Sequence, residues 1–241
     1  MNEILKIQEK IINLIYPQTC GICGKINNKT ICSKCNIQLK KQEKMGILTK
    51  EKLEENSLEM EKHFEELMYI FKYEGQIREL ILDYKFNEKS YMYKTFVNFF
   101  LKNKKIFENI KKYDKIIPVP ISKKRYKERG YNQTEIIAKI ISQNITNITM
   151  QKNVLIKYKN NKVQSQLNKE QRQQNVQNVY ELINEEIIKN KNILILDDIY
   201  TTGATCNECV KTLRNAQPKK IGIITIAKDC EKIQVKNNRK E

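Results

Sequence analysis

The segment from residue 193 to residue 205, I-L-I-L-D-D-I-Y-T-T-G-A-T, joins an apolar run to two carboxylates and then to a hydroxyl-rich turn. Asp197 and Asp198 follow four aliphatic residues without alternation, a pattern typical of a central parallel strand covered on both faces. Open α/β sheets bind ligands beyond the carboxyl ends of such strands, where two carboxylates can accept hydrogen bonds from vicinal ribose hydroxyls. The two acids therefore predict a sugar-binding edge.

The turn after the acids has the composition of a phosphate site. Gly203 permits a tight backbone turn, while N–H groups and threonine hydroxyls at the start of a helix can surround a dianionic phosphate. The residues concerned are Thr201, Thr202, Gly203, Ala204 and Thr205. The alternative is a solvated strand end followed by an ordinary helix start, but a turn signal alone explains neither the paired acids nor the threonine cluster.

Apolar positions after this turn recur at the spacing of one helical face, and they are Cys206, Cys209, Val210 and Leu213. This stripe predicts a helix that packs back on the sheet. Cys206 and Cys209 repeat the spacing of a metal-binding pair, but on this face we expect them to act as small core side chains rather than as a second metal site.

A second motif lies near the other end of the chain. Cys20 and Cys23 form one C-x2-C pair, and Cys32 and Cys35 form another after eight intervening residues. Two such pairs supply the four thiolates of a tetrahedral structural zinc site, with no open position for catalysis. A disulfide framework is the alternative, which the lack of an export signal disfavours.

The chain has 241 residues and a formal net charge of +17, from 45 basic and 28 acidic side chains. Such an excess favours anionic partners such as nucleic acid or polyphosphates. Few of the basic residues are arginines, however, so a compositional bias at exposed positions explains the charge equally well. No apolar run approaches the roughly 18 residues of a membrane span, and the first ten residues suggest an amphipathic helix, so we expect a cytoplasmic protein.

Composition along the chain predicts three regions. Residues 1–45 hold the N-terminal helix and the zinc module, residues 46–62 form a charged linker or exposed helix, and residues 63–241 form an α/β domain. Helices are expected around residues 77–84 and 89–103, and the first convincing core strand at residues 115–119, where two prolines require a turn. His63, the only histidine, has no candidate partner nearby and is expected to be structural or exposed.

A basic loop follows that strand. Ser122, Arg125 and Arg129 lie in a run of five cations, and Asn132 can cap the next helix with Glu135 in a capping-box-like pair. The alternatives are a solvated basic loop and a loop whose arginine forks grip a polyphosphate.

The acid and threonine segment resembles the phosphoribosyl-pyrophosphate loop of type I phosphoribosyltransferases. The basic loop, with P-V-P at residues 118–120 and R-G-Y-N-Q at residues 129–133, is similar to the ComF/GntX-like branch of that superfamily, which is linked to bacterial DNA uptake. The four-cysteine module also matches that branch. Further matches are Tyr73, Gly75, Arg78, Lys85, Phe86, Gln166, Arg172, Asn175 and Val176.

This resemblance implies a type I phosphoribosyltransferase fold, a central mostly parallel sheet flanked by helices, with a zinc module before it. It implies that Asp197 and Asp198 hold the ribose hydroxyls and act in catalysis, and that residues 201–205 hold the 5′-phosphate of phosphoribosyl pyrophosphate carrying Mg²⁺. The pyrophosphate would face Pro120, Ser122, Arg125 and Arg129. Purine-salvage members usually have an aspartate where this chain has Thr201, so ordinary purine salvage is not expected.

Two function classes remain open at this point. One is a phosphoribosyltransferase-like enzyme of unknown acceptor that acts in DNA uptake. The other is a non-catalytic module that handles single-stranded DNA, docks on a DNA-uptake helicase and uses its ligand site for sensing or stability. Residues 157–178 lack apolar periodicity and are expected to be an active-site lid or, over residues 167–175, a short polar helix.

Overall fold

The computed structural model describes residues 19–54, 63–86, 89–158 and 178–229. The predicted N-terminal helix, most of the predicted lid and Cys230 lie outside these ranges. So do four of the residues that carry the family resemblance, Gln166, Arg172, Asn175 and Val176.

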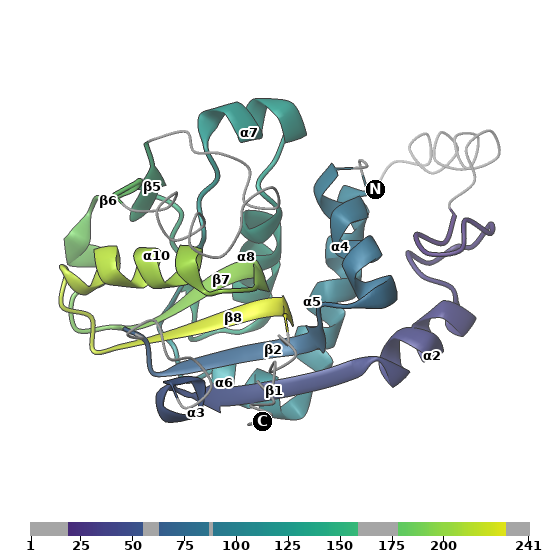
Figure 1. The fold of residues 1–241 in the computed structure, drawn as a ribbon, viewed down its shortest axis with the longest axis horizontal. Helices are drawn as coiled ribbons and strands as arrows, with labels where there is room; N and C mark the ends of the chain where they lie inside the picture. Colours follow the sequence, from purple (N-terminus) through teal and green to yellow (C-terminus); the bar gives the residue numbers. More distant parts are fainter. Residues whose placement is uncertain (1–18, 55–62, 87–88, 159–177, 230–241) are drawn as a thin grey trace, which may run out of the picture.

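The described chain contains helices and strands in mixed order (Figure 1). The helices are α2 (Ser33–Lys41), α3 (Lys50–Glu54), α4 (Gly75–Phe86), α5 (Tyr93–Lys102), α6 (Lys104–Ile110), α7 (Lys123–Arg129), α8 (Gln133–Asn144) and α10 (Ala204–Arg214), with the 3-10 turns η1 (Ser90–Met92) and η3 (Glu185–Ile187). The strands are β1 (Glu43–Thr49), β2 (Glu66–Lys72), β3 (Lys115–Pro118), β4 (Thr149–Met150), β5 (Leu155–Lys157), β6 (Tyr180–Leu182), β7 (Asn192–Tyr200) and β8 (Lys220–Lys228).

Six strands form the central sheet in the order β1-β2-β8-β7-β3-β4. Only β1 runs antiparallel to its neighbour, and β5 and β6 form a separate antiparallel pair. Parallel neighbours require crossover connections, which the helices between the strands supply. The predicted fold class, a mostly parallel sheet flanked by helices, is confirmed.

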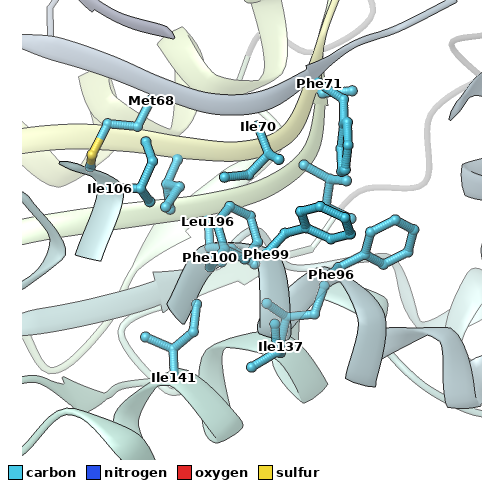
Figure 2. Packing of buried hydrophobic residues seen from close by; sticks show 14 of the residues in the cluster. Met68, Ile70, Phe71, Phe96, Phe99, Phe100, Ile106, Ile137, Ile141 and Leu196 are labelled. Atoms are coloured by element: carbon cyan, nitrogen blue, oxygen red, sulfur yellow. The ribbon is translucent and has the colours of Figure 1, made fainter. Parts of the chain in front are cut away.

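The central strand β7 is covered on both faces, as its continuous apolar run predicts. Ile193 and Ile195 belong to a core cluster shared with α10, whereas Leu194 and Leu196 belong to a second cluster shared with α5 and α8. Figure 2 shows the second cluster, in which Leu196 lies with aromatic side chains of α5 and isoleucines of α8. The two cores hold β7 in a fixed register and so position the residues at its end.

The predicted charged linker differs from the structure over its first half. Residues 43–49 form the edge strand β1, paired with β2, and residues 50–54 form α3. Met45 and Ile47 pack against one core and Leu48 against the other, so a few apolar residues anchor this edge strand. Residues 55–62 lie outside the described ranges.

Several local predictions are confirmed. The strand after residue 115 ends at Pro118, α4 and α5 cover the two predicted helical stretches, and the side chain of Asn132 caps α8 by accepting the N–H of Thr134 at 3.2 Å. The Glu135 carboxylate instead pairs with Lys152 at 3.3 Å. None of the helices described is both long and apolar enough to cross a membrane.

Candidate ligand-binding site

The candidate site lies where β3 stops and β7 continues. β3 pairs with β7 only as far as Pro118 opposite Leu196, while β7 goes on to Tyr200 beside β8. Asp197 and Asp198 therefore lie on a stretch of β7 that has lost its neighbour on the β3 side. A cavity of about 200 Å³ opens at this point, which is the position beyond the carboxyl strand ends where α/β sheets bind ligands.

Both predicted loops contribute to this cavity. From the acid and threonine segment it is lined by Asp197, Asp198, Thr201, Gly203, Ala204 and Thr205, and from the basic segment by Pro120, Arg125 and Arg129. Two predicted residues play local structural parts instead of lining it. Ser122 is buried and caps α7 by accepting the N–H of Arg125, and the Thr202 hydroxyl accepts the N–H of Ala204.

The two acids have different neighbours because β7 remains a strand through both of them. Successive side chains of a strand point to opposite faces. Asp197 lies on the α10 side, where the Cys206 thiol donates to its carboxylate at 3.6 Å. Asp198 lies on the other side, where Lys85 of α4 forms an ion pair with it at 2.8 Å. The predicted pair of acids thus borders the cavity from two faces of one strand.

The electrostatics of Asp197 are unusual. Burial raises the pKa of its carboxyl and the charge of Asp198 raises it further, while Lys85 and the backbone N–H of Asp198 lower it, and the net pKa is about 7. A pKa displaced by burial and a neighbouring acid is frequent at functional sites. Asp197 therefore changes charge near neutral pH.

The threonine turn has the backbone shape that the sequence predicts. Gly203 has φ +79°, the left-handed region, and caps α10, with its carbonyl accepting the N–H of Asn207 at 2.8 Å. A Cβ at this position would collide with the hydroxyl of Tyr200, which is buried beneath the turn. Glycine is thus required both by φ and by space, and the N-terminus of the eleven-residue helix α10 borders the cavity.

The start of α8 fixes the basic loop. The side-chain amide of Asn132 and the hydroxyl of Thr134 both donate to the carbonyl of Val119 at 3.1 Å. Asn132 and Thr134 are buried. A prolyl turn that leaves a sheet has carbonyls without ladder partners, and these two bonds satisfy one of them. The R-G-Y-N-Q motif therefore holds the turn that carries Pro120 into the cavity.

Lys85, Lys157 and Tyr180 also line the cavity, and the sequence analysis did not assign them to the ligand site. Lys157 and Tyr180 come from the β5–β6 pair, and the Lys157 ammonium lies 5.3 Å from the centre of the Tyr180 ring. Burial lowers the pKa of Lys157, the charge of Arg125 adds to this effect, and the net pKa is about 8. Strands of three residues have too little periodicity to be predicted from a local pattern. Lys85 appears in the sequence analysis only as one of the residues that match the family.

The chain is similar in sequence to a known domain family and to named competence proteins. The phosphoribosyl transferase domain family matches residues 133–240. Competence protein F of Haemophilus influenzae is 27% identical over 72% of this chain and 77% of its own length. Competence protein ComFC of Streptococcus pneumoniae is 25% identical over 89% of this chain and 82% of its own length, and that of Bacillus subtilis is 28% identical over 60% and 56%.

This chain is similar to the ComF competence proteins over most of its length, and to the phosphoribosyl transferase domain family over its C-terminal part. Among solved structures, a purine phosphoribosyltransferase from Pyrococcus horikoshii is 16% identical, with a TM-score of 0.36, over 58% of this chain and 83% of that chain.

The four-cysteine module of the ComF-like chain could hold a metal ion. The sulfurs of Cys20, Cys23, Cys32 and Cys35 all lie within 4.8 Å of one another. The Sγ atoms of Cys23 and Cys32 are 3.9 Å apart, close to the roughly 3.8 Å that a tetrahedron with metal–sulfur bonds of about 2.3 Å requires. Burial raises the pKa of Cys20, but backbone hydrogen bonds from Cys23, Cys32 and Ile22 outweigh it and bring the pKa to about 6.

Cys206 and Cys209 lie in the core beneath α10, as expected. Burial raises the pKa of both thiols well above the ordinary value, and the Asp197 charge adds to it. They therefore act as apolar side chains, with the Cys206 thiol also donating to Asp197. His63 lies apart from the cavity, and its backbone bonds to Asn207 and Arg214.

Proposed function

We propose that the cavity binds phosphoribosyl pyrophosphate with Mg²⁺ and that the protein acts as a phosphoribosyltransferase-like factor in DNA uptake. The observation that carries this proposal is the convergence of two loops, 118–134 and 197–205, on one cavity. One loop brings carboxylates and a helix N-terminus, and the other brings arginines. These are complementary to a ribose, a 5′-phosphate and a pyrophosphate within a single ligand.

Each group has a chemical task in this proposal. Asp197 and Asp198 accept hydrogen bonds from the ribose hydroxyls, and Thr201 to Thr205 surround the 5′-phosphate. The loop from Pro120 to Arg129 faces the pyrophosphate. When the bond from C1′ to the pyrophosphate oxygen breaks, positive charge grows on the sugar and negative charge on the leaving group, and acids and arginines stabilise the two ends. The acceptor then bonds to C1′ and gives up its proton.

We also propose that the metal of the cysteine module is zinc and that its role is structural. Four thiolate donors in two C-x2-C pairs suit Zn²⁺ and fill its tetrahedral shell. The role in competence is carried from the relatives, which are named competence proteins. The role in DNA uptake and the cytoplasmic location are proposed from the sequence.

A second candidate is a non-catalytic module that handles single-stranded DNA and docks on a DNA-uptake helicase. The feature that favours it is α7, whose sequence is K-K-R-Y-K-E-R and which has no buried residue. Tyr126 is 51% exposed on this helix. A helix polar all round gains little from packing, whereas lysines beside an exposed aromatic ring suit a phosphate backbone and its bases.

Calorimetry with phosphoribosyl pyrophosphate and Mg²⁺ tests the first candidate. Asp198→Asn removes a charged acceptor and should weaken binding by roughly 10- to 100-fold, which corresponds to about 1.5–3 kcal/mol. The matched control is Asp83→Asn, since Asp83 also pairs with a lysine, at 2.6 Å, but does not line the cavity. Equal affinities of the parent and Asp198→Asn would refute the site assignment.

Turnover separates the two candidates. The enzyme requires pyrophosphate release that depends on Mg²⁺ and on an acceptor, which a coupled pyrophosphate assay follows across nucleobases, amines and nucleic acids. Tight ligand binding without release for any acceptor would favour the sensing module.

A further inference from the structure

Lys85 is the last-turn lysine of α4 that forms an ion pair with Asp198. Lys85 Nζ and Asp198 Oδ2 are 2.8 Å apart, and the two side chains are only 17% and 16% exposed. An ion pair with this little exposure is held in one geometry and is poorly screened by solvent, unlike a surface pair. Its place inside the cavity therefore requires a functional explanation.

The end of α4 that carries Lys85 is fastened to the start of α8. The Tyr131 hydroxyl donates to the Tyr84 carbonyl at 2.7 Å, and the Gln133 side chain donates to the Lys85 carbonyl at 3.3 Å. The Tyr84 hydroxyl donates in return to the Gln133 carbonyl at 2.9 Å. Carbonyls in the last turn of a helix lack intrahelical partners. The R-G-Y-N-Q motif supplies hydrogen-bond donors to two of these carbonyls and thereby fixes the Lys85 backbone.

A contact between side chains reinforces the same junction. The Arg129 guanidinium lies 4.6 Å from the centre of the Phe86 ring and donates to the Gln133 side chain at 3.2 Å. Tyr84 and Gln133 are almost fully buried. The junction is thus well packed between elements that are nearly fifty residues apart, and Lys85 reaches from it to Asp198.

The charges around the two acids explain what the ion pair does. Adjacent carboxylates of a partly buried strand disfavour each other's ionised form. The charged and titratable groups around them are Lys85 and Tyr84 from α4, Arg129 from α7, Lys157 from β5, Tyr180 from β6, and Cys206 and Cys209 from α10, and Arg125 of α7 lines the same cavity. Lys85 contributes a positive charge in direct contact with one acid.

On the premise that the cavity takes a ribose phosphate, we propose that Lys85 is a positioning residue of this site: its ion pair holds Asp198 in place and favours the charged form of the neighbouring Asp197, which accepts ribose hydroxyls. The R-G-Y-N-Q motif has a second task in this account, because it orients α4 so that Lys85 reaches the acid. In this proposal, Lys85 sets the position and the charge of the two acids before a ligand binds.

The first test needs no ligand and therefore does not depend on the proposed function. Carboxyl titration by ¹³C NMR of the full-length protein compares the parent with Lys85→Met, Lys85→Arg and the control Lys89→Met. Lys89 pairs with Asp83 at 2.6 Å, away from the acids. Lys85→Met should raise the apparent pKa of Asp197 by about one unit, a tenfold change in acidity, while Lys85→Arg and Lys89→Met leave it in place. An unchanged titration in Lys85→Met overturns the proposal.

The second test uses the affinity for phosphoribosyl pyrophosphate with Mg²⁺ as a function of pH. Because Lys85→Met delays ionisation of Asp197, its affinity should be about tenfold below the parent at pH 6.5 and within about twofold at pH 9. Lys85→Arg should follow the parent. A loss of equal size at every pH, without rescue by arginine, would mean that Lys85 only supports the fold, and this outcome also overturns the proposal. If the parent itself does not bind, the proposed function fails while the titration still decides the role of Lys85.

Discussion

Asp197 shows how a single carboxyl couples the site to the stability of the fold. Its pKa of about 7 in the folded protein lies above the roughly 3.9 of an exposed aspartate. Between these values the folded protein binds a proton that the unfolded chain has released, so the free energy of unfolding falls as pH rises from about 4 to 7 and levels off above that. The burial of Asp197 thus destabilises the protein at neutral pH.

Replacement of Asp197 by asparagine removes this titration. The free energy of unfolding of Asp197→Asn relative to the parent should therefore increase by about 1–3 kcal/mol between pH 5 and pH 8. Urea unfolding at the two pH values measures the difference. The control is Glu108→Gln, which changes an exposed carboxylate paired with Lys111 and should show the same change in free energy of unfolding between the two pH values as the parent. If Asp197→Asn also showed the same change as the parent, the expected coupling would be contradicted.

The individual site residues could be predicted from sequence where their neighbours along the chain define them. The apolar run before Asp197 and the turn at Gly203 are local signals, and both predicted the right element. That the two acids border the cavity from opposite faces of β7 depends on β8, which keeps the strand extended to Tyr200. Lys85 reaches Asp198 only through the packing of α4 against α8, which no local pattern encodes.

At the scale of elements, the junction between β7 and α10 depends on one glycine. Gly203 and Gly130 have nearly the same φ, +79° and +76°, but a Cβ would meet Tyr200 at Gly203 and nothing within 4 Å at Gly130. Gly130→Ala should therefore cost only the backbone strain of about 1 kcal/mol, while Gly203→Ala adds a steric overlap and should cost at least about 2 kcal/mol. Urea unfolding compares the two, and equal losses would show that the turn can move away from Tyr200.

The strand β7 and the helix α10 could be predicted from the sequence, whereas the edge strand β1 could not. β7 and α10 carry continuous or periodic apolar positions because each faces a core. The edge strand β1 has one strand neighbour and keeps half-exposed positions along most of its length. It therefore has no long apolar run, and its second half lies in the stretch predicted to be a linker. Charge density thus indicated exposure correctly but not the absence of structure.

At the scale of the whole molecule, the cysteine module packs against the core of the α/β domain. Cys20, Cys35 and Leu39 belong to the same core cluster as Met92. A Cβ on Gly21 would lie 2.5 Å from the Met92 sulfur, and Lys89 bridges the Gly21 carbonyl and Asp83 of α4. Loss of the module's fold should therefore reach η1 and the start of α5.

Removal of the metal tests this connection. The purified protein should contain about one zinc ion per chain by mass spectrometry, and Cys23→Ser, which alters the most exposed ligand, should lose it because a structural site needs all four ligands. Hydrogen exchange should then show faster exchange in α2 and η1, with β7 and β8 still protected. Unchanged exchange in η1 would mean that the packing against Met92 does not depend on the metal.

The basic residues behind the net charge of +17 either form a specific nucleic-acid surface or reflect a general compositional bias. If α7 contacts phosphates, the change Lys123→Gln/Lys124→Gln/Lys127→Gln should weaken binding of a fluorescent single-stranded oligonucleotide and reduce the slope of log affinity against log salt by about 2, since each phosphate contact contributes about 0.7. The matched control Lys104→Gln/Lys105→Gln/Lys112→Gln removes the same charge at exposed positions in and just after α6, which lies at the opposite end of the molecule from α7 (Figure 1). A bias acting only through total charge predicts equal losses for both variants, whereas a surface centred on α7 predicts that the control retains the parent's slope. No affinity at low ionic strength in the parent would exclude direct contact with DNA and leave the cavity as the site through which this protein acts.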